Sequence, residues 1–261
     1  MTELLSGLTG LDIPLWSWWV VLLGGTSIGL AKTAIPGSSI LLVVLMAMAL
    51  PPRLSVGVML PMLIFGDFFA IGKYWPHVDR KRLFTLLPFS LIGLGGGYII
   101  LRYVTDEQLK PIIGGVVLAM LALQQVNSFL KKRRRDATDR PVSPLVTAVF
   151  GILSGMTTGM ANAAGPILNL YFLIARLPKL RFIATSAGFF FILNLLKVPL
   201  FVNLGIINAQ SLRVNLLTLP SIALGSLLGF WLVKRVSQEV FNRIVVRSEE
   251  HTSELQSHHD L

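Results

Sequence analysis

The sequence predicts an all-α membrane protein: a polytopic helical bundle of two five-segment repeats of inverted topology, with short broken or re-entrant helices. Three observations lead to this class. The chain is 53% hydrophobic and only 14% charged, with a mean hydropathy of +0.70, a composition that excludes an ordinary soluble domain. Long apolar stretches recur along the chain, and the second half repeats glycine and proline positions of the first.

Ten apolar stretches define the predicted helices. They lie at 15–31, 38–50, 54–74, 83–103 and 109–130, then at 145–163, 166–175, 182–202, 212–233 and from 240 onward. The second and the seventh are too short to span a hydrocarbon core of about 30 Å at about 1.5 Å of rise per residue. Gly and Pro precede both, so we expect broken or re-entrant helices there.

The two halves share a register. An offset of 132 residues relates Pro88, Gly93 and Gly97 to Pro220, Gly225 and Gly229. Further upstream the offset is 127, which pairs Asp67 with Asn194. Each half has five segments, an odd number, so the second half should enter the membrane from the side opposite to the first. A re-entrant pair enters and leaves on one side, as two full spans do, so such pairs would not change this prediction. Inverted repeats with interrupted helices are typical of secondary transporters, whose substrate site lies near the midplane.

These patterns divide the chain into a first transmembrane repeat (1–130), a basic cytoplasmic loop (131–143), a second repeat (144–246) and a tail (247–261). The tail is polar throughout, and its first eleven residues look like an in-frame translation of a common sequencing-library adapter. We therefore interpret it as a non-native scar rather than as a natural solvated tail. It stands where the repeat places the last helix, so the second repeat is predicted to be truncated.

Lys and Arg residues are unequally divided between the two predicted sides of the membrane. If residues 131–143 are cytoplasmic, fourteen basic residues lie inside and five outside. The sequence thus predicts a multi-pass protein of the plasma (inner) membrane with its N-terminus outside. Basic loops facing an anionic leaflet explain the formal charge of +10, so no nucleic-acid partner is expected.

The Gly/Pro breaks are the first candidate binding elements. The break GLAKTAIPGSS at 29–39 contains Lys32, Gly37 and Ser38, and its counterpart at 154–166 contains Asn162 and Gly165. Freed amides at the start of a half-helix carry a partial positive charge that suits an oxyanion. Close packing through small residues is the alternative interpretation, and the interruption of both halves favours a binding role.

Polar residues inside the apolar stretches supply the other candidates. Asp67 lies near the middle of the third stretch, where an acid costs about 2.5–3.5 kcal/mol on insertion scales, so it should face a cavity or a partner, or be protonated. We predict that Asp67 carries a coupling proton. The alternative is a structural hydrogen bond between helices, for which its repeat partner Asn194 is also suited.

Two lysines are embedded deeply enough to bind an anion. Lys32 stands in the first break, where its ammonium would add to the helix-end field, although it also fits an inside-facing anchor. Lys197 lies roughly 8 Å from the outer end of its stretch by helix rise, within reach of the interface, so a snorkelling anchor is its alternative. Thr157, Thr158 and Asn169 fit either a polar path or bonds between helices. The predicted substrate-binding residues are Lys32, Gly37, Ser38, Asn162, Gly165, Asn194 and Lys197.

Four stretches resemble the TauE/SafE family of sulfite exporters. They are GLAKTAIPG at 29–37, LPPRLSVGVMLPMLIFGDFFA at 50–70, SGMTTGMANAAGPILNLY at 154–171 and LPKLRFIATSAGFFFILNLLKVPLF at 177–201. The resemblance covers nearly the whole length to residue 246. It implies transport of sulfite or related organosulfur or oxyanion compounds across the plasma membrane. Both breaks depart from the GIGGG form common in the family, which leaves the substrate open within that class.

The predicted function is a secondary carrier that exports such anions by alternating access. A membrane-embedded enzyme would need nucleophiles, acid/base pairs or metal ligands at mid-depth, and the chain offers one intramembrane acid, no Cys and no buried His cluster. We therefore expect no enzymatic activity, no cofactor and no metal site. A structural or assembly subunit and an ion channel remain alternatives. The predicted partners are a small anionic substrate and the lipid bilayer, and homo-oligomerisation is left open.

Overall fold

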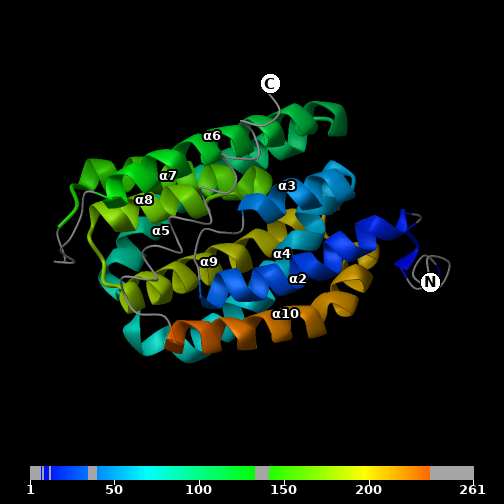
Figure 1. The fold of residues 1–261 in the computed structure, drawn as a ribbon. Helices are drawn as coiled ribbons and strands as arrows, with labels where there is room; N and C mark the ends of the chain where they lie inside the picture. Colours follow the sequence, from blue (N-terminus) through cyan, green and yellow to red (C-terminus); the bar gives the residue numbers. More distant parts are fainter. Residues whose placement is uncertain (1–6, 8, 12, 35–39, 133–140, 236–261) are drawn as a thin grey trace, which may run out of the picture.

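The computed structural model describes residues 7, 9–11, 13–34, 40–132 and 141–235, which form a bundle of helices (Figure 1). Those ranges contain no strand, which confirms the all-α class. The helices are α2 (Leu15–Thr33), α3 (Ile40–Ala49), α4 (Pro52–Tyr74), α5 (Arg80–Tyr103), α6 (Asp106–Lys132), α7 (Pro144–Ala161), α8 (Gly165–Ile174), α9 (Lys179–Asn203) and α10 (Ala209–Arg235), with a short 3₁₀ helix η1 (Trp75–His77) after α4. The predicted tenth segment and the tail lie outside the described residues.

Prolines and short polar side chains set the helix starts. Pro52 begins α4 and Pro144 begins α7, at positions where a backbone N–H has no helical partner and the proline φ is already suitable. Ser143 Oγ accepts a hydrogen bond from the Val146 N–H at 3.3 Å, and Asp79 caps α5 in the same way. The observed helices therefore begin close to the apolar stretches that predicted them.

Helix length separates two classes of segment. Five described helices are long and apolar enough to cross a bilayer: α4 with η1, α5, α7, α9 and α10. The helices α3 and α8 have ten residues each, which corresponds to about 15 Å, half of a typical hydrocarbon core. The two short segments are therefore confirmed, and the chain is a multi-pass membrane protein.

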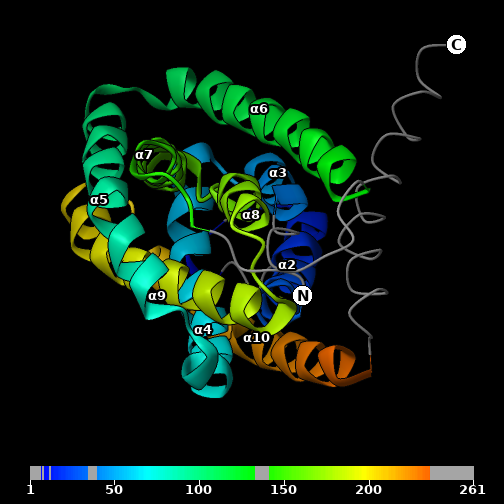
Figure 2. The ribbon, with the colours of Figure 1, turned by 90° about the vertical axis from the view of Figure 1, so that its left-hand side faces the viewer.

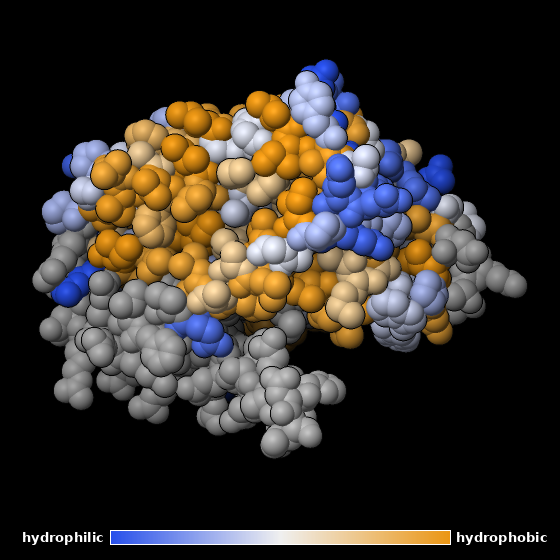
Figure 3. All heavy atoms as spheres, turned by 90° about the horizontal axis from the view of Figure 1, so that it is seen from above, coloured by the Kyte–Doolittle hydropathy of each residue, from blue (hydrophilic) through white to orange (hydrophobic). Residues whose placement is uncertain are grey.

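Large apolar side chains face outward from the bundle. Leu23, Phe84, Leu216 and Trp231 are each more than half exposed. Apolar side chains cover broad areas of the face in Figure 3, and hydrophilic ones gather toward its ends. Soluble proteins rarely expose apolar patches of this extent, so this surface fits a hydrocarbon environment.

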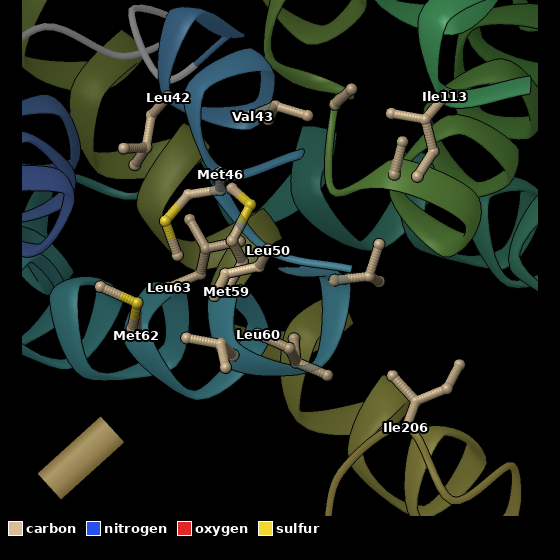
Figure 4. Packing of buried hydrophobic residues seen from close by; sticks show 14 of the residues in the cluster. Leu42, Val43, Met46, Leu50, Met59, Leu60, Met62, Leu63, Ile113 and Ile206 are labelled. Carbon is tan, nitrogen blue, oxygen red and sulfur yellow. The ribbon is translucent and has the colours of Figure 1, made fainter. Parts of the chain in front are cut away.

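One face of the short helix α3 packs onto the core of the bundle. Met46 of α3 is fully buried and lies close to Met59 and Leu63 of α4 (Figure 4). Ile113 of α6 and Ile206 after α9 belong to the same cluster. Because lipid tails are as apolar as these side chains, close packing rather than water exclusion keeps α3 in place.

Contacts between α4 and α9 fix their relative direction. Gly57, near the start of α4, lies against Ile206, just beyond the end of α9. Tyr74, at the end of α4, packs with Ile183 and Ala184 near the start of α9. The two helices are therefore antiparallel, as equivalent members of inverted repeats should be.

At two crossings, a helix of one half packs through a glycine against a helix of the other half. Gly93 of α5 packs onto the Ile152 carbonyl of α7, and Gly225 of α10 packs onto the Thr26 carbonyl of α2. A Cβ at either glycine would collide with that carbonyl, so both crossings depend on the missing side chain. The fourth segment of each half thus packs against the first segment of the other half. We propose the inverted-repeat relation on this exchange and on the antiparallel α4 and α9.

Basic side chains gather at one end of the bundle, which we call the basic end. Lys179 Nζ donates to the Val233 carbonyl at 3.5 Å, and the Asp79 N–H donates to Thr185 Oγ1 at 3.0 Å, so the starts of α5 and α9 meet the end of α10. The basic residues there are Arg80, Lys81, Arg82, Lys179, Arg181, Lys234 and Arg235. Its assignment to the cytoplasm, with the N-terminus outside, stays a prediction.

Candidate functional site

Asp67 and Asn194 form the centre of the candidate site. Asp67 is 0% exposed, and Asn194 Nδ2 donates a hydrogen bond to its Oδ2 at 2.8 Å. The sequence repeat pairs these two positions, and in the structure their side chains touch each other where α4 packs against α9.

Lys32 reaches this centre from the last turn of α2. Its Nζ donates to Asp67 Oδ2 at 3.1 Å and lies 2.8 Å from Oδ1, a second ion-pair contact that has no hydrogen-bond geometry. Gly66 makes room for the lysine stem, because a Cβ there would stand 3.1 Å from Lys32 Cγ. The ammonium also lies 4.4 Å from the centre of the Phe190 ring. Lys32 is thus an internal ion-pair partner with a side chain only 10% exposed.

Lys197 is fully buried and bound to neutral oxygen atoms. Its Nζ donates to Asn162 Oδ1 at 2.6 Å, to Thr158 Oγ1 at 3.0 Å and to the Thr158 carbonyl at 3.2 Å. These acceptors lie at the C-terminal end of α7, where a cation is electrostatically favoured. The side chain is 0% exposed and points inward, so the snorkelling alternative does not apply.

Asn162 organises the break between α7 and α8. It adopts a left-handed backbone conformation with φ 55°, which ends α7 and turns the chain. Its Nδ2 donates to the Val56 carbonyl of α4 at 3.1 Å, while its Oδ1 accepts from Lys197. One side chain therefore ties the broken helix to both α4 and α9.

The half-helix α8 begins at Gly165 beside this break. It is buried from Gly165 to Phe172, and Figure 2 shows it inside the bundle between α6 and α9. No side chain caps its first turn, so the amides that follow Pro166 at its start are the type of donors that suit an anion.

A small cavity joins the two breaks. Its volume is about 20 Å³, room for about one water molecule. The described residues that line it are Ala31, Lys32, Leu63, Thr158, Asn162, Gly165, Ser186, Ala187, Phe190 and Asn194. Ser186 Oγ and Asn194 Oδ1 are buried without a hydrogen-bond partner among the described residues, so the cavity wall carries unused polar atoms.

The predicted substrate-binding residues divide into three groups. Lys32, Asn162, Gly165 and Asn194 line the cavity. Lys197 lies behind its wall and bonds two lining residues. Gly37 and Ser38 lie outside the described residues. Their predicted role in binding substrate is not tested by the described structure.

Other polar candidates separate in the same way. Thr158 lines the cavity and accepts a hydrogen bond from Lys197. Thr157 Oγ1 instead donates to the Leu153 carbonyl of its own helix at 2.8 Å. Asn169 is buried farther along α8 and is absent from the cavity lining that the structure describes.

Sequence reasoning missed Ser186 and Phe190. Their positions form a stripe with Asn194 and Lys197, at intervals of four, four and three residues, which places all four on one face of α9. That spacing was the available signal, and it was hidden in a run of apolar and aromatic residues.

Comparison with known families agrees with the site's location. The family model described as "Sulfite exporter TauE/SafE" matches residues 20–247, which include both breaks and every described residue of the cavity wall. Searches of curated proteins and of solved structures gave no significant match. This is a family of membrane transporters for sulfite-type anions, not of enzymes. With a match over most of its length, the chain belongs to the TauE/SafE sulfite exporter family.

Proposed function

We propose that the protein is a secondary carrier that exports sulfite or a related organosulfur or oxyanion compound across the plasma membrane by alternating access. The observation that carries this proposal is the buried cavity between the two helix breaks, with Lys32 in its wall and Lys197 directly behind it. Two ammonium groups beside unused polar atoms at the bundle centre favour an anionic ligand.

The size of the cavity supports a carrier cycle. About 20 Å³ accommodates one water molecule but not an oxyanion of four heavy atoms. Loading therefore requires helices to move apart. The two breaks offer the parts for this motion, because a short half-helix such as α8 can shift with little change in the long helices.

Asp67 is suited to the predicted coupling of a proton. Its Oδ2 is bonded by both Lys32 and Asn194, but its Oδ1 has no hydrogen bond. A divalent anion that draws Lys32 away would leave the carboxylate unpaired beside a second negative charge, which favours proton uptake by Asp67. We therefore propose that Asp67 carries the coupling proton and that Lys32 alternates between Asp67 and the substrate.

The cavity argues against the two alternative functions. A structural or assembly subunit would have no reason to keep a polar cavity between its two breaks. An ion channel would need a continuous polar path, whereas the cavity that joins the breaks has room for about one water molecule. Flux that saturates with substrate concentration would distinguish a carrier from a pore.

The test is efflux of radiolabelled sulfite from proteoliposomes that contain the full-length protein. We expect efflux above empty vesicles that a pH gradient stimulates, and a decrease of at least about tenfold for Lys32→Gln, since one close unit charge is lost. Lys73→Gln is the matched control, because Lys73 is an exposed lysine at the end of α4. No efflux above empty vesicles at any pH gradient would rule out the sulfite assignment.

A further inference from the structure

The charges buried at the centre do not sum to zero. Asp67 is the one buried carboxylate among the described residues. Two lysines belong to the same centre: Lys32 is paired with Asp67, and Lys197 donates to Thr158 and Asn162 in the cavity wall. Other charged side chains in the described helices lie toward the ends of the bundle, so with all three groups ionised the centre carries one net positive charge.

The pairing shows which charge is uncompensated. Both oxygens of Asp67 lie within 3.1 Å of Lys32 Nζ. Lys197 Nζ, in contrast, contacts only a carbonyl, a hydroxyl and an amide oxygen. Neutral oxygen atoms solvate an ammonium but do not cancel its charge, and an isolated buried charge is unfavourable.

The cavity lies where a compensating charge would have to be placed. Thr158 and Asn162 form part of its wall and are the same residues that hold Lys197. Lys32, Ser186 and Asn194 complete the polar part of the wall. An anion in this space would lie between the two ammonium groups and would also accept a hydrogen bond from the unpartnered Ser186 hydroxyl.

We infer that the site is matched to a monovalent anion and accepts a divalent one only together with a proton. One negative charge in the cavity brings the sum with Lys32, Asp67 and Lys197 to zero. A second negative charge is balanced when Asp67 takes a proton from water and becomes a neutral carboxylic acid. This inference rests on the proposed function and adds the charge class of the substrate: hydrogen sulfite or a monovalent sulfonate before sulfite or sulfate.

With Lys32 and Lys197 both ionised, no other group among the described residues is placed to balance the second charge. Asp67 faces Lys32 from α2, and Asn194 and Lys197 from α9. The charged residues of α10 are Arg213, Lys234 and Arg235, at its two ends, and α3 has none. The carboxylate of Asp67 is therefore the one described group at this depth that can gain a proton when the ligand carries two negative charges.

The experiment counts protons during anion binding. Purified full-length protein is titrated calorimetrically with sodium methanesulfonate and with sodium sulfate, whose charges are fixed near neutral pH, in two buffers of different ionisation enthalpy. We expect no net proton uptake with methanesulfonate and about one proton per sulfate. Sulfate binding without proton uptake would overturn the inference. Proton uptake with methanesulfonate would also overturn it, because the centre would then carry no net positive charge. This measurement needs no variant.

Asp67→Asn tests the same point with a second readout. Removal of the carboxylate leaves two uncompensated ammonium groups, so the ratio of sulfate to methanesulfonate affinity should rise at least about tenfold and sulfate should bind without a proton. Glu107→Gln, which removes an exposed carboxylate at the start of α6, should leave the ratio unchanged. An unchanged ratio in Asp67→Asn would contradict the inference.

Failure of the inference can be told apart from failure of the proposed function. If the proteoliposomes show saturable sulfite efflux but sulfate binds to the protein without a proton, the transporter assignment stands and only the charge class is wrong. If neither probe binds and sulfite efflux does not exceed that of empty vesicles, the proposed function itself is wrong.

Discussion

Each of the two helix breaks is associated with an internal lysine, but the two lysines have different chemical settings. Lys32 of the first break is paired with a carboxylate, whereas Lys197 at the second break is bound by the neutral oxygens of Thr158 and Asn162. An ion pair can exchange its partner for a ligand or lose charge by protonation. A lysine held by neutral groups has no such exchange available. We therefore propose that the first break is adjustable and that Lys197 supplies a positive charge at the second.

A similar chemical difference separates Asp67 from Asn194, the two positions that the sequence repeat pairs. Asp67 and Asn194 touch each other, and both use a side-chain group of the same shape. Only Asp67 can bind a proton, so an arrangement that the repeat makes similar in form differs in charge. The asymmetry confines the proposed coupling to one half of the molecule.

The largest effect is expected at the fixed cation. Lys197→Met should lower sulfite efflux and methanesulfonate affinity by at least about a hundredfold, because it removes the uncompensated charge and leaves Asn162 and Thr158 without their donor. Lys73→Met is the matched control at the end of α4. Efflux close to the wild-type rate in a folded Lys197→Met protein would show that the second break does not supply the charge.

The next effect concerns the adjustable half. Asp67→Asn should abolish the stimulation of efflux by a pH gradient and lower gradient-driven efflux about tenfold, because the variant can no longer bind and release a proton. Exchange of sulfite for sulfite at equal pH should continue. The two fluxes are compared in the same proteoliposomes. If gradient stimulation persists in the variant, Asp67 does not carry the coupling proton.

Glycine substitutions compare the two halves through packing. Gly93→Ala and Gly225→Ala should each lower the free energy of unfolding by about 1–3 kcal/mol, because a Cβ meets a backbone carbonyl in both crossings. Gly95→Ala is the control, since nothing lies within 4 Å of its Cβ position. Thermal unfolding in detergent measures the effect. A loss at one glycine only would argue against equivalent crossings.

The smallest effect is expected at the cavity wall. Ser186→Ala removes an unpartnered buried hydroxyl, so the protein should be as stable as the wild type or slightly more stable. Sulfite affinity should fall by about two- to fivefold, the value of one hydrogen bond to a charged ligand at the weak end of its range. Unchanged affinity would remove Ser186 from the binding site.

Much of this arrangement could be predicted from periodicity and composition. Apolar stretches located each described helix, and the repeat paired Asp67 with Asn194 before their contact was known. These features depend on the local sequence or on its repetition, and bilayer thickness restricts the remaining choices.

The direction in which side chains point could not be predicted. Lys197 fitted a snorkelling anchor by its distance from the end of its helix, yet it turns inward onto α7. Ser186 and Phe190 stood out only after α9 was placed against the cavity, because the rotation of a helix depends on its neighbours in space. The partners of Lys32 likewise depend on the crossing of α2 with α4.

Binding of an anion between the two breaks can be tested by an experimental structure with bound selenite, the heavier analogue of sulfite, through the anomalous signal of selenium. We expect one peak in an expanded cavity, within hydrogen-bond distance of Lys32 Nζ and near Ser186 and Asn194, with the Lys32–Asp67 contact lengthened. Selenium only at the ends of the bundle, with the cavity unchanged, would contradict it.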